Sequence, residues 1–275
     1  MKRTIADAFR RAADSDRAAF MPFVTGGFPY PQTCLELLLG LERQGADLIE
    51  LGIPFSDPLA DGPVIQHASQ LALEAGATPE AVLELAAEAT ARMQAPLLLM
   101  TYCNPVLRMG PAEFARRAAR AGVAGVIIPD LPPEEAQPWL EAARGQGLDT
   151  VFMAAPTTPP DRLERVAELS RGFLYYVSLT GVTGSELSLD RGIGEALARA
   201  RRVSPVPVAV GFGVATPAQA RALAGMADGV IVGSALVKLV LEAPQAKQGV
   251  AAALALAGQL AAALGKQRFL HEGPN

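Results

Sequence analysis

The chain has 275 residues, of which 50% are hydrophobic and 19% charged, so it can bury a large core and is expected to be globular. The formal net charge is −4 and no block of Lys and Arg occurs, so binding to nucleic acid is not expected. The two cysteines, Cys34 and Cys103, have no CxxC neighbour and cannot form a disulfide framework, which favours a reducing, cytoplasmic location.

The N-terminal stretch, MKRTIADAFRRAADSDRAAF, carries a charged residue every few positions. It has no apolar run of the kind that a signal peptide needs, so export is not expected. We expect an extra helix here, ahead of the first strand.

Short runs rich in β-branched residues alternate with segments of helical spacing along the rest of the chain. This alternation favours an α/β protein with a parallel sheet. Segments such as PEAVLELAAEATARM and AEFARRAARAG have helix patterning, and several begin with Pro and end with Gly. Eight strands are predicted, at residues 20–26, 46–52, 96–102, 124–130, 149–155, 173–179, 206–212 and 228–234.

Eight strand-and-helix units without a Gly/Ser/Pro-rich linker predict a single (β/α)8 TIM barrel over residues 1–275, preceded by the N-terminal helix. A doubly wound open sheet is the alternative, and it would hold its ligand at one switch point in the strand order. The apolar run at residues 250–264 is shorter than the roughly 20 residues that span a bilayer. We therefore expect a packed helix there and no association with membranes.

Polar residues and glycines follow most of the predicted strands, where the active site of a barrel lies. They include Thr25 to Gly27, Glu50, Asp61, Tyr102, Asn104, Asp130, Tyr175, Tyr176 and the run from Gly181 to Gly184. The last two strands end in Gly211-Phe212-Gly213 and Gly233-Ser234. Glycine-rich turns at these two places hold a phosphate in many barrel enzymes, so a small phosphorylated substrate is expected.

Several mechanisms are excluded by the residues that are missing from the strand ends. The four lysines, Lys2, Lys238, Lys247 and Lys266, do not end a strand, which argues against Schiff-base and pyridoxal chemistry. His67 and His271 are too few for a histidine-rich metal centre. The sequence TGGFPYPQ after the first strand is not a dinucleotide fingerprint. No metal and no cofactor are therefore expected.

Acid and base catalysis by carboxyl groups remains, and Glu50 is the first candidate because it lies in an apolar strand. An apolar environment disfavours the charged form of a carboxyl group and so allows it to donate a proton near neutral pH. Asp61 follows in a more polar loop and is expected to stay an acceptor. The structural alternatives are an ion pair for Glu50 and, for Asp61, a helix N-cap or a role in ordering the loop.

The sequence resembles the tryptophan synthase alpha chain family in five stretches that occur in the same order. They are PFVTGGFP, IELGIPFSDPLADGP, SLTGVTG, VGFGVATPAQ and DGVIVGSALVK. The resemblance extends over residues 18–240 and covers every predicted strand end. It implies a barrel enzyme that splits indole-3-glycerol phosphate into indole and glyceraldehyde 3-phosphate by a retro-aldol reaction without a Schiff base or metal.

The resemblance also assigns roles to individual residues. Glu50 matches the acid/base carboxylate, and Asp61 matches the aspartate that hydrogen-bonds the indole N–H. The substrate-binding positions that we expect are Phe23, Tyr102, Tyr175, Thr183, Gly184, Phe212, Gly213, Gly233 and Ser234. Among these, Phe23 and Phe212 match the indole pocket, and Thr183 matches the loop that closes on Asp61. Tyr176, the neighbour of Tyr175, is expected to face the opposite side of its strand.

By the same resemblance, the chain works with a pyridoxal-phosphate beta chain in an α2β2 assembly, with loop 54–60 and Asp57 at the contact. Leu179 and the short segment after Gly184 depart from the pattern of some members, which concerns closure of the lid more than the chemistry. Thr101, next to Met100, is a further departure, since some members have an apolar residue there. Two other functions stay open at this point. One is a phosphate-barrel isomerase or epimerase, and the other is a catalytically weak partner that activates a beta chain.

Overall fold

The computed structural model describes residues 4–177, 191–211 and 213–265. Its strands are β1 (Ala19–Thr25), β2 (Ile49–Gly52), β3 (Leu97–Met100), β4 (Gly125–Ile127), β5 (Asp149–Val151), β6 (Met153–Ala154), β7 (Leu174–Val177), β8 (Val208–Gly211) and β9 (Gly229–Val232). They form one parallel sheet in the order β5-β4-β3-β2-β1-β9-β8-β7-β6. The predicted barrel is confirmed, and the open-sheet alternative is wrong.

The nine strands correspond to the eight that were predicted, because the fifth is interrupted at Phe152. β5 pairs with β4 up to Val151, and β6 pairs with β7 from Met153 onward. At the interruption, the N–H of Phe152 donates to the Ser170 hydroxyl (3.3 Å), while the carbonyl accepts from the N–H of Tyr175 (3.0 Å). The two outer strands of the order are therefore joined by a single residue, which closes the sheet into a barrel.

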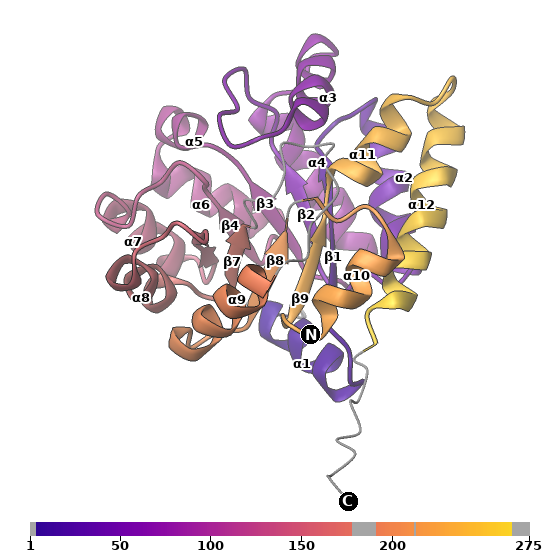
Figure 1. Ribbon diagram of the computed structural model, residues 1–275. Helices are drawn as coiled ribbons and strands as arrows, with labels where there is room; N and C mark the ends of the chain where they lie inside the picture. The colour runs from indigo at the N-terminus through magenta and orange to yellow at the C-terminus, as the bar shows by residue number, and fades with distance from the viewer. Residues whose placement is uncertain (1–3, 178–190, 212, 266–275) are drawn as a thin grey trace, which may run out of the picture.

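Helices surround the barrel (Figure 1). They are α1 (Ile5–Asp14), α2 (Pro31–Arg43), α3 (Pro63–Glu74), α4 (Pro79–Arg92), α5 (Cys103–Met109), α6 (Pro111–Arg120), α7 (Gln137–Gly145), α8 (Pro160–Leu169), α9 (Arg191–Val203), α10 (Pro217–Ala224), α11 (Ser234–Leu241) and α12 (Ala246–Ala263). Many begin with Pro, which has no N–H to leave unpaired in the first turn. Within the described ranges, no helix has the length and apolar character needed to cross a membrane.

The expected N-terminal helix is α1, and it packs against the N-terminal end of the barrel. A capping box formed by Thr4 and Asp7 starts it. Its Phe9 ring lies 5.6 Å from the ring of Phe173. A Cβ atom at Gly229, the first residue of β9, would lie 2.9 Å from the Phe9 ring, so the missing side chain makes room for the helix. The interior is thus filled at this end, and the cavity lies at the other.

Candidate active site

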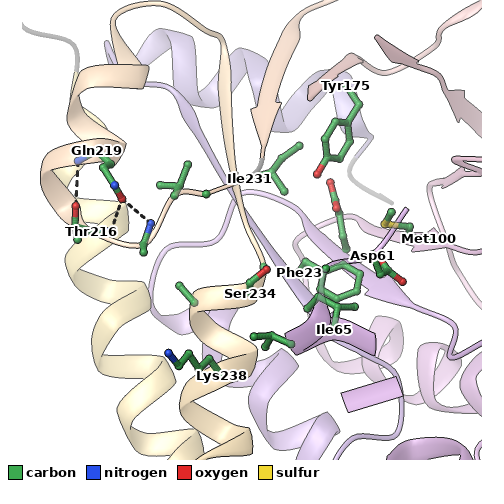
Figure 2. Close-up of a pocket in the computed structure, with 18 residues that line it drawn as sticks. Phe23, Asp61, Ile65, Met100, Tyr175, Thr216, Gln219, Ile231, Ser234 and Lys238 are labelled. Atoms are coloured by element: carbon green, nitrogen blue, oxygen red, sulfur yellow. Dashed lines mark hydrogen bonds between the residues drawn. The ribbon is translucent and has the colours of Figure 1, made fainter. Parts of the chain in front are cut away.

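A cavity of about 390 Å³ lies at the carboxyl ends of the strands. Phe23, Glu50 and Tyr175 line it from β1, β2 and β7, and Asp61 lines it from the loop after β2. Figure 2 shows Tyr175, Phe23, Asp61 and Met100 on one side of the cavity and Thr216, Gln219 and Lys238 on the other. The site therefore has one side with carboxyl groups and aromatic rings, and a second side formed by the starts of α10 and α11.

Glu50 is fully buried and lies beside Phe23 in the register of β1 and β2. Neither of its carboxyl oxygens has a hydrogen-bond partner among the described residues, which argues against the structural ion pair. Burial alone raises the pKa of Glu50 to about 8. At neutral pH the carboxyl group therefore carries a proton that it can donate into the cavity.

Tyr175 faces the cavity from β7, and its ring depends on a glycine in the next strand. A Cβ atom at Gly211 would lie 2.5 Å from the Tyr175 hydroxyl. Burial, and then the nearby carboxyl groups of Glu50 and Asp61, raise the pKa of Tyr175, so its hydroxyl stays protonated. The neighbouring Tyr176 interacts with Arg199 of α9, as expected for the opposite side of the strand.

Asp61 is held at the cavity by Tyr102, which comes from the end of β3. The Tyr102 hydroxyl accepts a hydrogen bond from the N–H of Ala60 (3.1 Å) and is also hydrogen-bonded to the Asp61 side chain. Burial raises the pKa of Asp61 to about 6, and the bond to Tyr102 opposes this rise. Asp61 is thus mainly charged at neutral pH.

The N-cap alternative for Asp61 is not supported, because Gly62 is the N-cap of α3 and no side chain caps it. The surroundings thus give Glu50 a higher pKa than Asp61. At neutral pH this difference suits Glu50 to act as an acid and Asp61 to act as a hydrogen-bond acceptor.

Phe23 forms part of an apolar wall, and neighbouring glycines leave room for its side chain. A Cβ atom at Gly52 would be 2.5 Å from the ring, and one at Gly233 would be 3.3 Å from the Cβ of Phe23. The wall is completed by Val64, Ile65, Met100 and Ile231. Such a surface suits an aromatic ligand more than a sugar.

Gly213, Gly233 and Ser234 line the other side of the cavity. Gly213 has a φ of +77°, which favours glycine, and Gly233 is the N-cap of α11. No side chain caps the N-terminus of α11, so its first N–H groups face a ligand site without a competing acceptor. An N-terminus of this kind favours a phosphate.

Thr216, Gln219 and Lys238 also line the cavity, and sequence reasoning did not select them. Thr216 and Gln219 form the capping box of α10. Lys238 does not end a strand, which argues only against Schiff-base and pyridoxal chemistry. It lies four residues after Ser234 in α11, and this helical spacing is the signal that could have identified it.

The other predicted site residues lie elsewhere. Tyr102 is behind Asp61, and its ring packs on Phe55 with 5.4 Å between the ring centroids. Asp57 is exposed on the loop after β2, where it accepts a hydrogen bond from the Ser56 hydroxyl (2.5 Å). Thr183, Gly184 and Phe212 are outside the described residues, as is Leu179. No group of three metal-ligating side chains occurs in the part of the chain that is described.

Comparison with known proteins agrees with this geometry. The model of the tryptophan synthase alpha chain family matches residues 9–265. The tryptophan synthase alpha chain of Gloeobacter violaceus is 49% identical over 247 residues, which cover 89% of this chain and 90% of that one. The alpha chain of Prochlorococcus marinus is 48% identical over 236 residues, or 86% of each chain.

Solved structures lead to the same family. A structure of Mycobacterium tuberculosis tryptophan synthase matches with a TM-score of 0.88 and 39% identity, covering 97% of this chain and 100% of that chain. The alpha subunit from Legionella pneumophila matches with a TM-score of 0.87 and 36% identity, covering 94% and 97%. The chain therefore belongs to the tryptophan synthase alpha chain family, and it is an alpha subunit of tryptophan synthase, a lyase of tryptophan biosynthesis.

Proposed function

We propose that the chain cleaves indole-3-glycerol phosphate into indole and glyceraldehyde 3-phosphate by a retro-aldol reaction in which Glu50 is the acid and the base. The observation that carries this proposal is the buried Glu50 carboxyl group, which lines the cavity without a hydrogen-bond partner among the described residues. Its pKa of about 8 keeps a proton available at neutral pH.

The reaction balances with a single proton that leaves Glu50 and returns to it. Protonated Glu50 gives its proton to the indole carbon that carries the glycerol chain, and the ring takes a positive charge at its nitrogen. The Glu50 carboxylate then removes the proton of the neighbouring glycerol hydroxyl. The carbon–carbon bond breaks, its electron pair returns to the ring, and the hydroxyl carbon becomes the aldehyde of glyceraldehyde 3-phosphate.

Asp61 stabilises the intermediate by accepting a hydrogen bond from the indole N–H, where the positive charge develops. This role needs an ionised carboxylate, and the pKa of about 6 provides one at neutral pH. Tyr102 acts through Asp61: its hydroxyl bonds both the Asp61 side chain and the N–H of the preceding residue, so it is a positioning residue.

The substrate lies with its indole ring against Phe23 and the apolar wall, and with its phosphate at Gly213, Gly233 and Ser234. This placement is supported by the burial of Phe23 and by the uncapped start of α11. Thr183, Gly184 and Phe212 are assigned to the same substrate by the family motif.

The proposed partner is a tryptophan synthase beta chain in an α2β2 assembly in the cytoplasm, with loop 54–60 and Asp57 at the contact. The side chain of Leu59 in this loop is 91% exposed, which is unusual for leucine and suits a surface that a partner covers. Asp61 directly follows the loop. A partner that binds the loop can therefore change the position of the Asp61 carboxylate.

The pH dependence of indole release tests these roles. For the free enzyme, kcat/KM should fall below a pH of about 6, where Asp61 becomes neutral, and above about 8, where Glu50 loses its proton. Tyr102→Phe removes a bond that lowers the pKa of Asp61, so the acid limb should move to higher pH. Tyr176→Phe is the control, since Tyr176 interacts with α9. A profile without the two limbs would overturn the assignment.

A further inference from the structure

Lys238 is the basic side chain among the described residues that line the cavity, whereas Glu50 and Asp61 both contribute carboxyl groups. A phosphorylated substrate carries close to two negative charges at neutral pH. Its phosphate must enter a site that already contains the negative Asp61. A cation beside the phosphate would offset this repulsion.

The position of Lys238 on α11 suits this role. Lys238 follows Ser234 by four residues, so the two positions lie about one turn apart along the same face of α11. Side chains on a helix tilt toward its N-terminus, and a lysine stem is about as long as one helical turn. The ammonium group can therefore reach the level of Ser234, where the phosphate is placed.

Backbone N–H groups at the start of α10, on this side of the cavity, are already engaged. The Gln219 Oε1 atom accepts from the N–H groups of Ala215 (2.8 Å) and Thr216 (3.1 Å). The Thr216 hydroxyl oxygen accepts from the N–H of Gln219 (3.3 Å). The loop after β8 thus uses the N–H groups of Ala215 and Thr216 for its own capping, and Lys238 adds a positive charge to the open N–H groups at the start of α11.

The ammonium group of Lys238 has capacity for a ligand. Its ion-pair partner is Glu242, with 3.7 Å between Nζ and the carboxylate oxygen, which is longer than a hydrogen bond. Both side chains are more than half exposed, at 56% and 64%, so water weakens this pair. A phosphate at the start of α11 can compete for the ammonium group.

We propose that Lys238 is a phosphate-recognition residue, which binds the substrate phosphate from the α11 side and makes the site prefer the phosphorylated ligand. The inference rests on the proposed function and adds a specificity residue to it. It assigns Lys238 to binding and leaves the proton transfers to Glu50.

Two ligands that differ only in the phosphate test the proposal. Binding of indole-3-propanol phosphate and of indole-3-propanol is measured by calorimetry for the wild type, Lys238→Met and Lys247→Met. Lys247 is an exposed lysine of α12 and controls for the loss of one positive charge from the chain. Lys238→Met should weaken binding of the phosphate ligand roughly 3- to 10-fold and leave the alcohol unchanged. Lys247→Met should change neither.

Two further readouts separate recognition from a structural effect. Added salt should weaken binding of the phosphate ligand more in the wild type than in Lys238→Met, because it screens the ion pair. With indole-3-glycerol phosphate, Lys238→Met should raise KM and leave kcat nearly unchanged.

Equal losses for both ligands, or no loss for the phosphate ligand, would overturn the role of Lys238. If the wild type and Lys238→Met turn over the substrate and bind the phosphate ligand equally well, the role of Lys238 is wrong and the proposed function stands. If the wild type neither binds the phosphate ligand nor releases indole, the proposed function fails with it.

Discussion

The pKa of Glu50 links the catalytic role that we propose for this residue to the stability of the fold. Burial raises its pKa from 4.5 to about 8. Between these two pH values the unfolded chain has lost a proton that the folded chain still holds. The contribution of Glu50 to stability is therefore fully present below a pH of about 4.5 and is lost progressively as the pH rises to about 8.

Glu50→Gln removes this pH dependence, because an amide does not ionise. The variant should be more stable than the wild type by roughly 4 kcal/mol at pH 8, and the difference should disappear toward pH 4.5. Urea unfolding across this range measures it. Glu84→Gln, at an exposed position of α4, is the matched control and should show no such trend. A constant difference across the range would mean that Glu50 is ionised in the folded chain.

The sequence was informative where a residue broke a local pattern and silent where function depends on tertiary position. Glu50 could be selected as a candidate because a carboxyl group interrupts an apolar strand, and it does line the cavity. Lys238 lines the cavity but could not be selected, because on the sequence alone it resembles any lysine in an amphipathic helix. The contact of Tyr102 with Asp61 depends on how the loop after β2 folds onto the end of β3. The spacing of these residues in the sequence does not predict this contact.

Among the helices, α1 packs against the N-terminal end of the barrel and helps to fill it. Its Ile5 side chain reaches Gly172, where a Cβ atom would lie 2.9 Å from Ile5 Cδ1. Its Phe9 side chain packs beside Phe173. These contacts fill the barrel from the end opposite to the active site.

Phe9→Ala should destabilise the chain by about 3 to 5 kcal/mol, because it leaves a cavity where the ring packed. Indole release by the folded protein should change little, since Phe9 does not line the active-site cavity. Arg10→Ala is the control on the same helix, and its side chain is 67% exposed. Stability and turnover measured on the same samples separate the two effects. A large loss of kcat in folded Phe9→Ala would contradict a purely structural role for α1.

The pattern of strands was predictable, but the interruption of the fifth strand was not. The run at residues 149–155 has the composition of a continuous strand, and its apolar residues give no sign of a break. At Phe152 the N–H donates to the side chain of Ser170, and the neighbouring strand changes from β4 to β7. This change of neighbour divides one predicted strand into β5 and β6.

For the whole molecule, the closed barrel brings the ends of β1, β2, β7 and β9 around one cavity, and the loop after β2 connects this cavity to the surface. Counting the strands predicted this arrangement, because parallel strands in a closed sheet have their carboxyl ends at one rim. The partner could be inferred only from the family motif, since an exposed Leu59 does not identify what covers it.

Leu59→Asp should leave indole release by the isolated chain nearly unchanged and reduce its stimulation by a beta chain at least several-fold, because it places a charge in an apolar contact. Arg10→Glu, on α1 at the opposite end of the barrel, is the control for the change in charge and should keep the stimulation. Turnover is measured for each variant with increasing amounts of beta chain. Normal stimulation of Leu59→Asp would exclude loop 54–60 from the contact.

The most direct test of the account is indole release from indole-3-glycerol phosphate by the wild type and by Glu50→Gln, each with and without a beta chain. The account predicts that the wild type releases indole, faster with the partner, and that folded Glu50→Gln is at least about 100-fold slower in both conditions. Equal release by the two proteins would contradict it, because Glu50 would then be a structural residue and the proton transfers would have to come from another group in the cavity.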